Sequence, residues 1–196
     1  MSAWLSPPNL LTYLRMVLTP VVAIAILQGR HRSALALVVF AGLTDGADGF
    51  LARHFAWQTR IGGYLDPIAD KLMLVVVYGA LTAAGYAPVW LFLLILLRDV
   101  WILAMVGFAW RATPIRDFPP RIAGKLSTAA QIALAATLLI RNAFSGLVPG
   151  TLVNLFSFLV VAMAIASGVD YTLVALRRYR AWRNSSTSAS AGLPTN

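Results

Sequence analysis

The chain has 196 residues, of which 59% are hydrophobic and only 12% are charged, and its net charge is +9. Soluble domains are rarely so apolar, so the composition predicts an all-α polytopic membrane protein. Cysteine is absent, which excludes disulfides and thiolate metal sites, and in a membrane chain the positive charge indicates contact with anionic lipid head groups rather than with nucleic acid.

Six segments, taken in chain order, are apolar over about the 20 residues that a helix needs to cross a membrane. No segment alternates like a β-strand, and the breaks between the six coincide with clusters of turn-forming or charged residues. The expected transmembrane helices cover residues 10–27, 33–52, 63–84, 88–110, 126–140 and 152–176. They predict one six-helix domain over residues 1–183, followed by a polar, disordered tail over residues 184–196.

The distribution of Lys and Arg predicts the orientation of these helices. With the N-terminus in the cytoplasm, the outer loops hold only Arg30, Arg32 and Arg141. The cytoplasmic loops and tail then hold Arg53, Arg60, Arg111, Arg116, Arg121, Lys125, Arg177, Arg178, Arg180 and Arg183. By the positive-inside rule, both termini are expected in the cytoplasm. The first segment lacks the pattern of a signal peptide, so we expect it to be retained in a multi-pass protein of a bacterial inner membrane.

Four aspartates interrupt the second and third apolar segments. They are Asp45, Asp48, Asp66 and Asp70. At a rise of 1.5 Å per residue, the first two lie about 12 and 8 Å before Arg53, and the other two lie about 6 and 12 Å beyond Gly62. Each pair also shares a helix face, because its members are three or four residues apart. The sequence therefore places four carboxylates around one spot just below the cytoplasmic interface.

Four like charges in an apolar setting are costly, at about 3 kcal/mol for a carboxylate at mid-membrane, and they also repel one another. Bound cations would relieve both costs, and two divalent ions would balance four carboxylates. Oxygen ligands, with His54 as the only histidine nearby, favour Mg²⁺, Mn²⁺ or Ca²⁺ over Zn²⁺. The structural alternatives are protonation, helix capping, or ion pairs with Arg53, Arg60 or Lys71.

The aspartates belong to a longer pattern, which reads Asp45-x-x-Asp48-Gly49-x-x-Ala52-Arg53, eight residues, then Gly62-x-x-x-Asp66-x-x-x-Asp70. This pattern resembles the signature of the CDP-alcohol phosphotransferase family at every fixed position. The stretch PNLLTYLR at the start of the first segment and the basic entry to the fifth are similar to that family as well. The resemblance covers everything except the polar tail.

The resemblance implies an enzyme that transfers the phosphatidyl group of CDP-diacylglycerol to an acceptor hydroxyl and releases CMP, with its active site facing the cytoplasm. It implies two divalent cations, Mg²⁺ or Mn²⁺, and a homodimer. Asp45, Asp48 and Asp66 would bind metal, and Asp70 would bind metal or act as general base. The nucleotide pocket would be lined by Asn9, Thr12, Gly49, Ala52, Arg53 and Gly62. Paired metals and a nearby proton acceptor suit such chemistry on physical grounds.

Three basic residues outside the pattern are candidates for holding an acceptor phosphate: Arg98, Arg121 and Lys125. Arg98 lies about as deep as the inner aspartates, while Lys125 opens the fifth segment. The structural alternatives are an ion pair of Arg98 with Asp99 and a solvated basic loop for the other two. The surrounding strings resemble cardiolipin synthases, so we favour phosphatidylglycerol as the acceptor, with glycerol 3-phosphate as the alternative.

Two other classes of protein also keep acids in a membrane. A divalent cation transporter needs a polar path to the outer side, and the stretch LMLVVVYGALTAA after Asp70 offers none. A non-catalytic scaffold would leave the lipid composition of the cell unchanged when Asp70 is replaced by Asn. The sequence therefore favours the enzyme.

Overall fold

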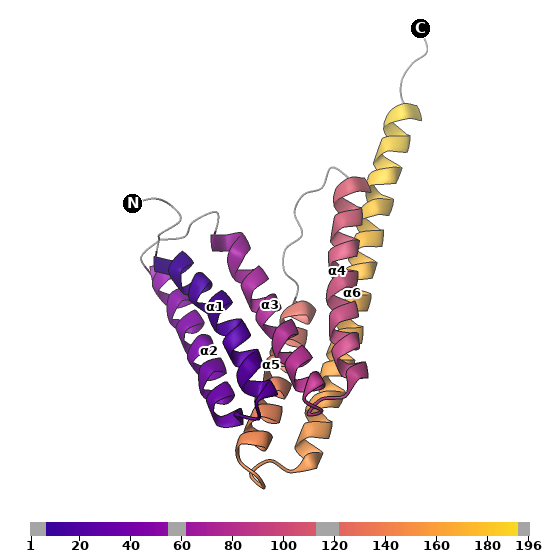
Figure 1. Ribbon diagram of the computed structural model, residues 1–196. Coiled ribbons are helices and arrows are strands. Elements are labelled where there is room, and N and C mark those ends of the chain that lie inside the picture. The colour runs from indigo at the N-terminus through magenta and orange to yellow at the C-terminus, as the bar shows by residue number, and fades with distance from the viewer. Residues whose placement is uncertain (1–6, 55–61, 113–121, 192–196) are drawn as a thin grey trace. The chain divides into compact units, whose positions relative to one another are not determined.

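The structure is a computed structural model, and it describes residues 7–54, 62–112 and 122–191, with side chains described for residues 12–44, 69–109, 111 and 122–183. Regular structure in these ranges is entirely α-helical, which confirms the all-α part of the predicted fold class (Figure 1). The helices are α1 (Pro7–Leu27), α2 (His31–His54), α3 (Gly62–Ala83), α4 (Val89–Ala112), α5 (Ile122–Ala143) and α6 (Gly150–Ala191).

The last helix is longer than the sequence predicts. α6 continues to Ala191, so residues 184–191, for which we expected disorder, are helical. Extending an existing helix by one residue costs far less than starting a new one, and residues 184–191 contain neither Gly nor Pro. The polar composition of this stretch therefore does not exclude a helix.

Two of the turns that separate the helices depend on glycine in the left-handed region. Gly29 has φ 70° and Gly85 has φ 79°. At each, the glycine N–H donates three residues back and the next N–H donates five residues back, as in Arg30 N to Ala25 O at 2.8 Å. This pattern caps the last carbonyls of α1 and α3, and a side chain at either position would strain the backbone.

The chain forms two compact units. The first consists of Met1–Phe92 and Gln131–Ser157. In this unit α1 packs against both α2 and α3, as Figure 1 shows. The core is made of fully buried side chains such as Ile26, Tyr78 and Leu134, and the Tyr78 hydroxyl donates to Gln131 O at 2.7 Å. This bond ties α3 to the middle of α5.

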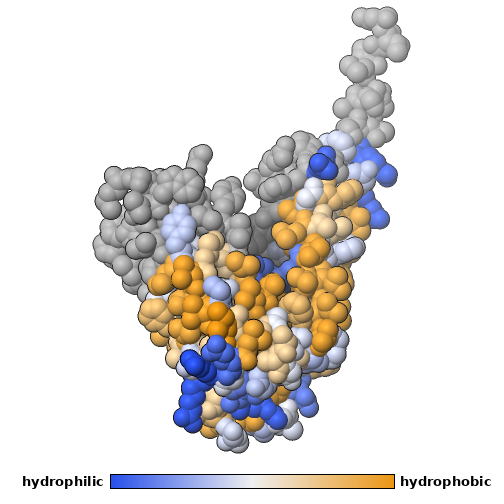
Figure 2. Space-filling view, in the orientation of Figure 1, coloured by the Kyte–Doolittle hydropathy of each residue, from blue (hydrophilic) through white to orange (hydrophobic). Residues whose placement is uncertain are grey.

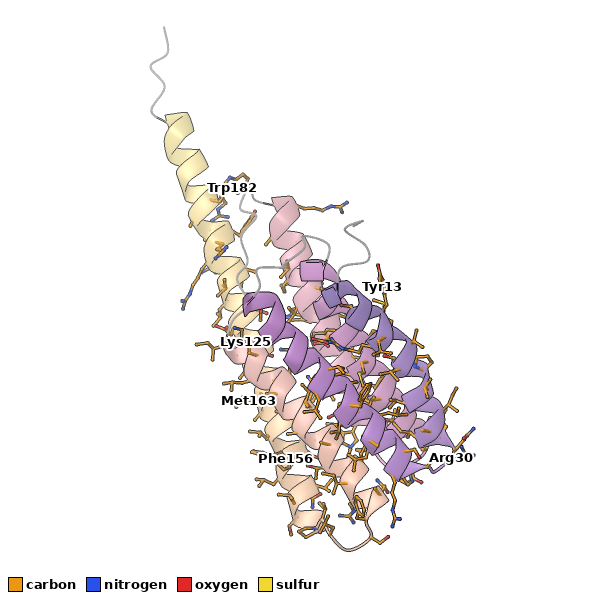
Figure 3. All side chains as sticks on the ribbon, turned by 90° about the vertical axis from the view of Figure 1, so that its left-hand side faces the viewer. Tyr13, Arg30, Lys125, Phe156, Met163 and Trp182 are labelled. Carbon is orange, nitrogen blue, oxygen red and sulfur yellow. The ribbon has the colours of Figure 1, made fainter. Side chains whose placement is uncertain are left out.

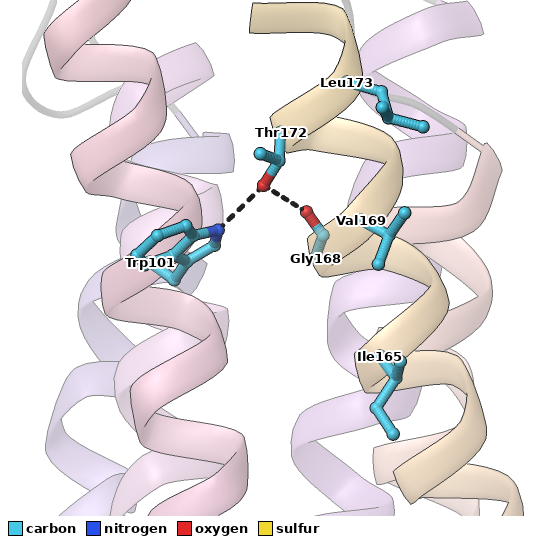
Figure 4. Close-up of a pocket in the computed structure, with 6 residues that line it drawn as sticks. All are labelled: Trp101, Ile165, Gly168, Val169, Thr172 and Leu173. Carbon is cyan, nitrogen blue, oxygen red and sulfur yellow. Dashed lines mark hydrogen bonds between the residues drawn. The ribbon is translucent and has the colours of Figure 1, made fainter. Parts of the chain in front are cut away.

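The second unit consists of Leu93–Ala130 and Phe158–Asn196, so it joins most of α4 to most of α6. Trp101 Nε1 donates to Thr172 Oγ1 at 2.9 Å, and that hydroxyl donates to Gly168 O at 2.7 Å (Figure 4). A cavity of about 360 Å³ adjoins this bond. Ile165, Val169 and Leu173 also line it, which makes it an apolar recess.

The surface of the helices is strongly apolar. Large side chains such as Leu103, Ile122 and Phe158 are more than two-thirds exposed, and Figure 2 shows apolar side chains along the helices. Among the described residues, three segments are long and apolar enough to cross a membrane: Val89–Ala109, Ile122–Ala143 and Gly150–Arg183. Exposed apolar surface of this extent fits a lipid environment and supports a membrane protein.

Candidate active site

The motif aspartates lie on two helices of the first unit. Asp45 and Asp48 fall in the last ten residues of α2, and Asp66 and Asp70 fall in the first nine residues of α3. The helical spacing on which each pair depends is therefore confirmed. Of the four side chains, only that of Asp70 is among those the structure describes.

The Asp70 carboxylate forms an ion pair with a residue of α1. An Arg15 guanidinium nitrogen, Nη1, donates to Asp70 Oδ1. The Arg15 side chain is 6% exposed, whereas that of Asp70 is 47% exposed. The cation is therefore enclosed by the protein, while the carboxylate still opens on one side to solvent or to a ligand.

Arg15 belongs to a polar stripe on the otherwise apolar α1. Thr12, Arg15 and Thr19 are three and four residues apart, so they share one helix face, and all three are buried. Thr19 Oγ1 donates to the backbone oxygen of Arg15 at 2.8 Å. Because α1 packs on α2 and α3, this stripe lines the same bundle that carries the acids. Thr12, a predicted nucleotide-binding residue, lies one turn from the ion pair.

Arg15 was absent from the predicted site and from the predicted ion pairs, which named Arg53, Arg60 and Lys71. The signal was present, because a lone cation within an apolar helix is a functional candidate by default. Its depth also matches. Arg15 is eight residues from the start of α1 and Asp70 is eight from the start of α3, so both lie about 12 Å from those ends.

The remaining nucleotide-pocket candidates lie on the same helices. Asn9 is in the first turn of α1, Gly49, Ala52 and Arg53 are in the last turns of α2, and Gly62 begins α3. Their side chains lie outside those that the structure describes, so their roles stay predictions. Every predicted nucleotide contact therefore lies on α1 or on α2 and α3, the two helices that α1 packs against.

The predicted acceptor residues belong to the second unit. Arg98 is 7% exposed, and it donates from Nε to Ser167 Oγ at 2.8 Å and from Nη1 to Asp99 Oδ1 at 2.6 Å. The ion pair of Arg98 with Asp99, which was the structural alternative to acceptor binding, is therefore present. Lys125 is exposed in the first turn of α5, and Arg121 lies outside the described residues. An acceptor role for the three stays a prediction.

The donor set of the motif suits a hard cation. All four of its candidate ligands are carboxylates, and the one described carboxylate keeps an open side beside Arg15. Within the described side chains, no group of three or more His, Cys, Asp or Glu is present. The motif aspartates therefore stay the predicted metal ligands.

Comparison with known proteins identifies the family. Residues 5–170 match the family model of the CDP-alcohol phosphatidyltransferases. The chain is 36% identical over 154 residues to the rat cardiolipin synthase (CMP-forming), covering 70% of this chain. It is 32% identical over 171 residues to the CDP-diacylglycerol--glycerol-3-phosphate 3-phosphatidyltransferase of Aquifex aeolicus, covering 85% of this chain. A probable phosphatidylglycerophosphate synthase of Mycobacterium tuberculosis is 33% identical over 177 residues.

The extent of these matches differs between the two kinds of relative. The chain spans about half the length of the rat and human cardiolipin synthases, at 51% of each, but 93% of the Aquifex aeolicus protein. The family model covers both the α2–α3 motif and the Arg15 stripe of α1. By this match the chain belongs to the CDP-alcohol phosphatidyltransferase family, a family of transferase enzymes.

Proposed function

We propose that the protein transfers the phosphatidyl group of CDP-diacylglycerol to the hydroxyl of a glycerol-type acceptor and releases CMP. The observation that carries this proposal is the complete motif on α2 and α3, with Asp70 held by the buried Arg15 of α1. A transporter would not need a family signature for a nucleotide-linked lipid, so membership of the family favours the transferase.

Each part of the site has a distinct task under this proposal. Asp70 accepts the proton of the attacking hydroxyl, and its half-exposed position gives that hydroxyl access. Arg15 fixes the position of the Asp70 carboxylate, which orients it toward the reacting atoms. The open backbone beside Gly49 and Ala52 admits the nucleotide, and Arg53 meets a phosphate at the interface.

The motif carboxylates would hold two divalent cations, Mg²⁺ or Mn²⁺. When bound, such ions neutralise the phosphate oxygens at which charge develops during transfer. Asp45, Asp48 and Asp66 supply ligands in this arrangement, and Asp70 lies one turn beyond Asp66 on the same face of α3. The proposal therefore makes activity dependent on added divalent metal.

The favoured acceptor is phosphatidylglycerol, which gives cardiolipin. Relatives named cardiolipin synthase from rat and human are 36% and 34% identical over 154 residues. Glycerol 3-phosphate is the second candidate, because the chain spans 93% of the Aquifex aeolicus relative whose name includes that acceptor. Arg98, Arg121 and Lys125 are the residues proposed to bind the acceptor phosphate in either case.

The proposal also places the protein in its membrane. All six helices cross the bilayer, with both termini and the active site on the cytoplasmic side of a bacterial inner membrane, and the protein is a homodimer. The positive-inside bias of the loops supports this orientation. The apolar stretches Thr12–Leu27 and His31–Thr44 support membrane contact for α1 and α2 as well.

The experiment is a transfer assay on the purified full chain. CDP-diacylglycerol is supplied with Mg²⁺ or Mn²⁺ and with phosphatidylglycerol, glycerol 3-phosphate, serine or inositol phosphate in turn, and lipid products are separated by thin-layer chromatography. We expect CMP release and cardiolipin with phosphatidylglycerol, loss of activity on chelation, and recovery when metal returns. Folded protein that transfers to none of these acceptors would overturn the proposal.

Arg98 is tested by its effect on the two substrates. If it binds the acceptor phosphate, Arg98→Lys raises the acceptor KM several-fold and leaves the CDP-diacylglycerol KM nearly unchanged, because Lys keeps the charge but loses the forked geometry. Lys125→Gln, at an exposed position, serves as a companion variant that removes one charge without touching the buried pair. Equal changes in both KM values would assign Arg98 to structure alone.

A further inference from the structure

A second polar site lies in the first unit, at the end where α1 turns into α2. A cavity of about 310 Å³ is present there. It is lined by the turn residues Arg30, His31, Arg32 and Ser33 and by Asn142 and Ala143 from the end of α5. Figure 3 labels Arg30 at the end of α1 opposite Tyr13, and Figure 2 shows a hydrophilic patch at this end of the helices.

This cavity carries positive charge without a carboxylate to balance it. Arg30 and Arg32 both line it. The only acids in the first unit are the four motif aspartates, and Asp45, the first of them along α2, is 13 residues beyond Arg32, or about 20 Å. Two guanidinium groups in a recess that no described carboxylate lines are suited to an anion from outside the chain, and above all to a phosphate.

A histidine forms part of the cavity wall. His31 Nε2 lies 3.0 Å from the Tyr86 hydroxyl, and the two rings meet edge to face with their centroids 4.6 Å apart. These contacts hold the imidazole in place beside the two arginines, so its ring signals report on the cavity.

Arg32 and Arg30 contribute differently to this site. Arg32 Nε donates to Ala143 O at 3.3 Å, and the guanidinium lies 5.4 Å from the centroid of the Phe144 ring. These contacts fix Arg32 between the α1–α2 turn and the end of α5. Arg30, in contrast, makes no ion pair or side-chain hydrogen bond with the described residues. Its guanidinium is available to a ligand.

We propose that this cavity binds a phosphate group, that of an anionic phospholipid head group, through Arg30 and Arg32. The surroundings favour a lipid over free phosphate, because exposed apolar side chains flank the cavity. Leu27 is 56% exposed before the turn, and Phe144 is 43% exposed after α5. Acyl chains can lie along them while the phosphate enters the recess. The site uses no residue of the transferase motif, so it can be tested separately from the proposed activity.

The test uses the fact that the chain has only two histidines. The full protein, carrying isotope-labelled histidine, is placed in nanodiscs of phosphatidylcholine, and phosphatidylglycerol is added in increasing proportion. The His31 ring signals, assigned with His31→Gln, report on the cavity. We expect them to shift saturably with phosphatidylglycerol and to shift little with inorganic phosphate at matched concentration. Shifts with inorganic phosphate alone would assign the site to a free anion instead of a lipid, which would overturn the proposal.

Matched variants distinguish a built site from general surface charge. Arg30→Gln should raise the proportion of phosphatidylglycerol needed for half-saturation by about fivefold, the usual effect of one basic residue at an anionic surface. Arg30→Lys should keep that proportion within about twofold of the parent value. Arg141→Gln is the control, because that guanidinium does not line the cavity and lies 3.2 Å from where a methyl group on Gly150 would be. Equal weakening by Arg30→Gln and Arg141→Gln, or no His31 shift with any anion, would refute the site.

Discussion

The ion pair between Arg15 and Asp70 makes an asymmetric prediction, because its two partners are buried to different extents. Arg15 is 6% exposed and Asp70 is 47% exposed. Replacing Asp70 by Ala takes a charged hydrogen-bond partner from the buried Arg15 guanidinium, which costs about 1.5–3 kcal/mol. Arg15→Met leaves a carboxylate that solvent still reaches, so we expect a loss of about 1–2 kcal/mol. Asp70→Asn keeps an oxygen acceptor for Arg15 and should cost about 1 kcal/mol.

Activity should follow a different order from stability. Asp70→Asn removes the proton acceptor and should lower the rate of CMP release by about 10²–10⁴-fold, although it is the mildest change for folding. Arg15→Met leaves the carboxylate chemically intact but no longer fixed, and we expect a loss of about tenfold to a hundredfold. A variant that is nearly as stable as the parent yet inactive would separate the chemical role of Asp70 from its structural one.

Both quantities are measured on the same purified variants. Unfolding is followed by tryptophan fluorescence in detergent with increasing denaturant, and CMP release is followed with CDP-diacylglycerol at saturating metal. Arg178→Met serves as a control that removes an arginine from α6, which carries no residue of the motif. The reasoning fails if Asp70→Asn destabilises as much as Asp70→Ala, or if Arg15→Met is fully active.

Two further predictions concern packing. Gln131 is fully buried, and neither polar atom of its side-chain amide has a hydrogen-bond partner in the described part of the chain. Gln131→Met should therefore raise the free energy of unfolding by about 1–2 kcal/mol. A decrease would show that the amide has hydrogen-bond partners when the protein is in the membrane. A methyl group on Gly124 would lie 3.2 Å from the Tyr171 hydroxyl, whereas one on Gly107 would meet nothing within 4 Å. Gly107→Ala should therefore stabilise by about 0.5–1 kcal/mol in thermal unfolding, and Gly124→Ala should give no such gain.

The helical architecture was predictable because lipid leaves few choices to the backbone. Six apolar segments of sufficient length, separated by turn signals, predicted the six helices, and the glycines at residues 29 and 85 lie where the first and third end. The end of α6 was not predictable in the same way. Hydropathy shows where the apolar stretch of a helix ends and not where the helix itself ends, and α6 continues past its apolar stretch to Ala191.

The candidate site was predictable only where its residues are close together in sequence. The spacing of Asp66 and Asp70 identifies them as a pair, since a helix puts residues four apart on one face. Arg15 is 55 residues from Asp70, and their contact depends on how α1 packs on α3, which no local pattern specifies. Depth along each helix was the one sequence signal that links them. The same limit applies to Ser167, whose contact with the buried Arg98 joins α4 to α6.

The charge of Arg15 can do something for the site that bound metal ions alone cannot. Under the proposed function, four ionised aspartates and two divalent cations sum to zero, so the net attraction for an anionic substrate comes from the cations beside them. Arg53 supplies one such charge at the interface and Arg15 adds a second, so the loaded site attracts the diphosphate of CDP-diacylglycerol before it binds. Since the Arg15 side chain is 6% exposed, solvent screens this charge little. A buried arginine on α1 therefore serves both the position of Asp70 and the capture of the donor.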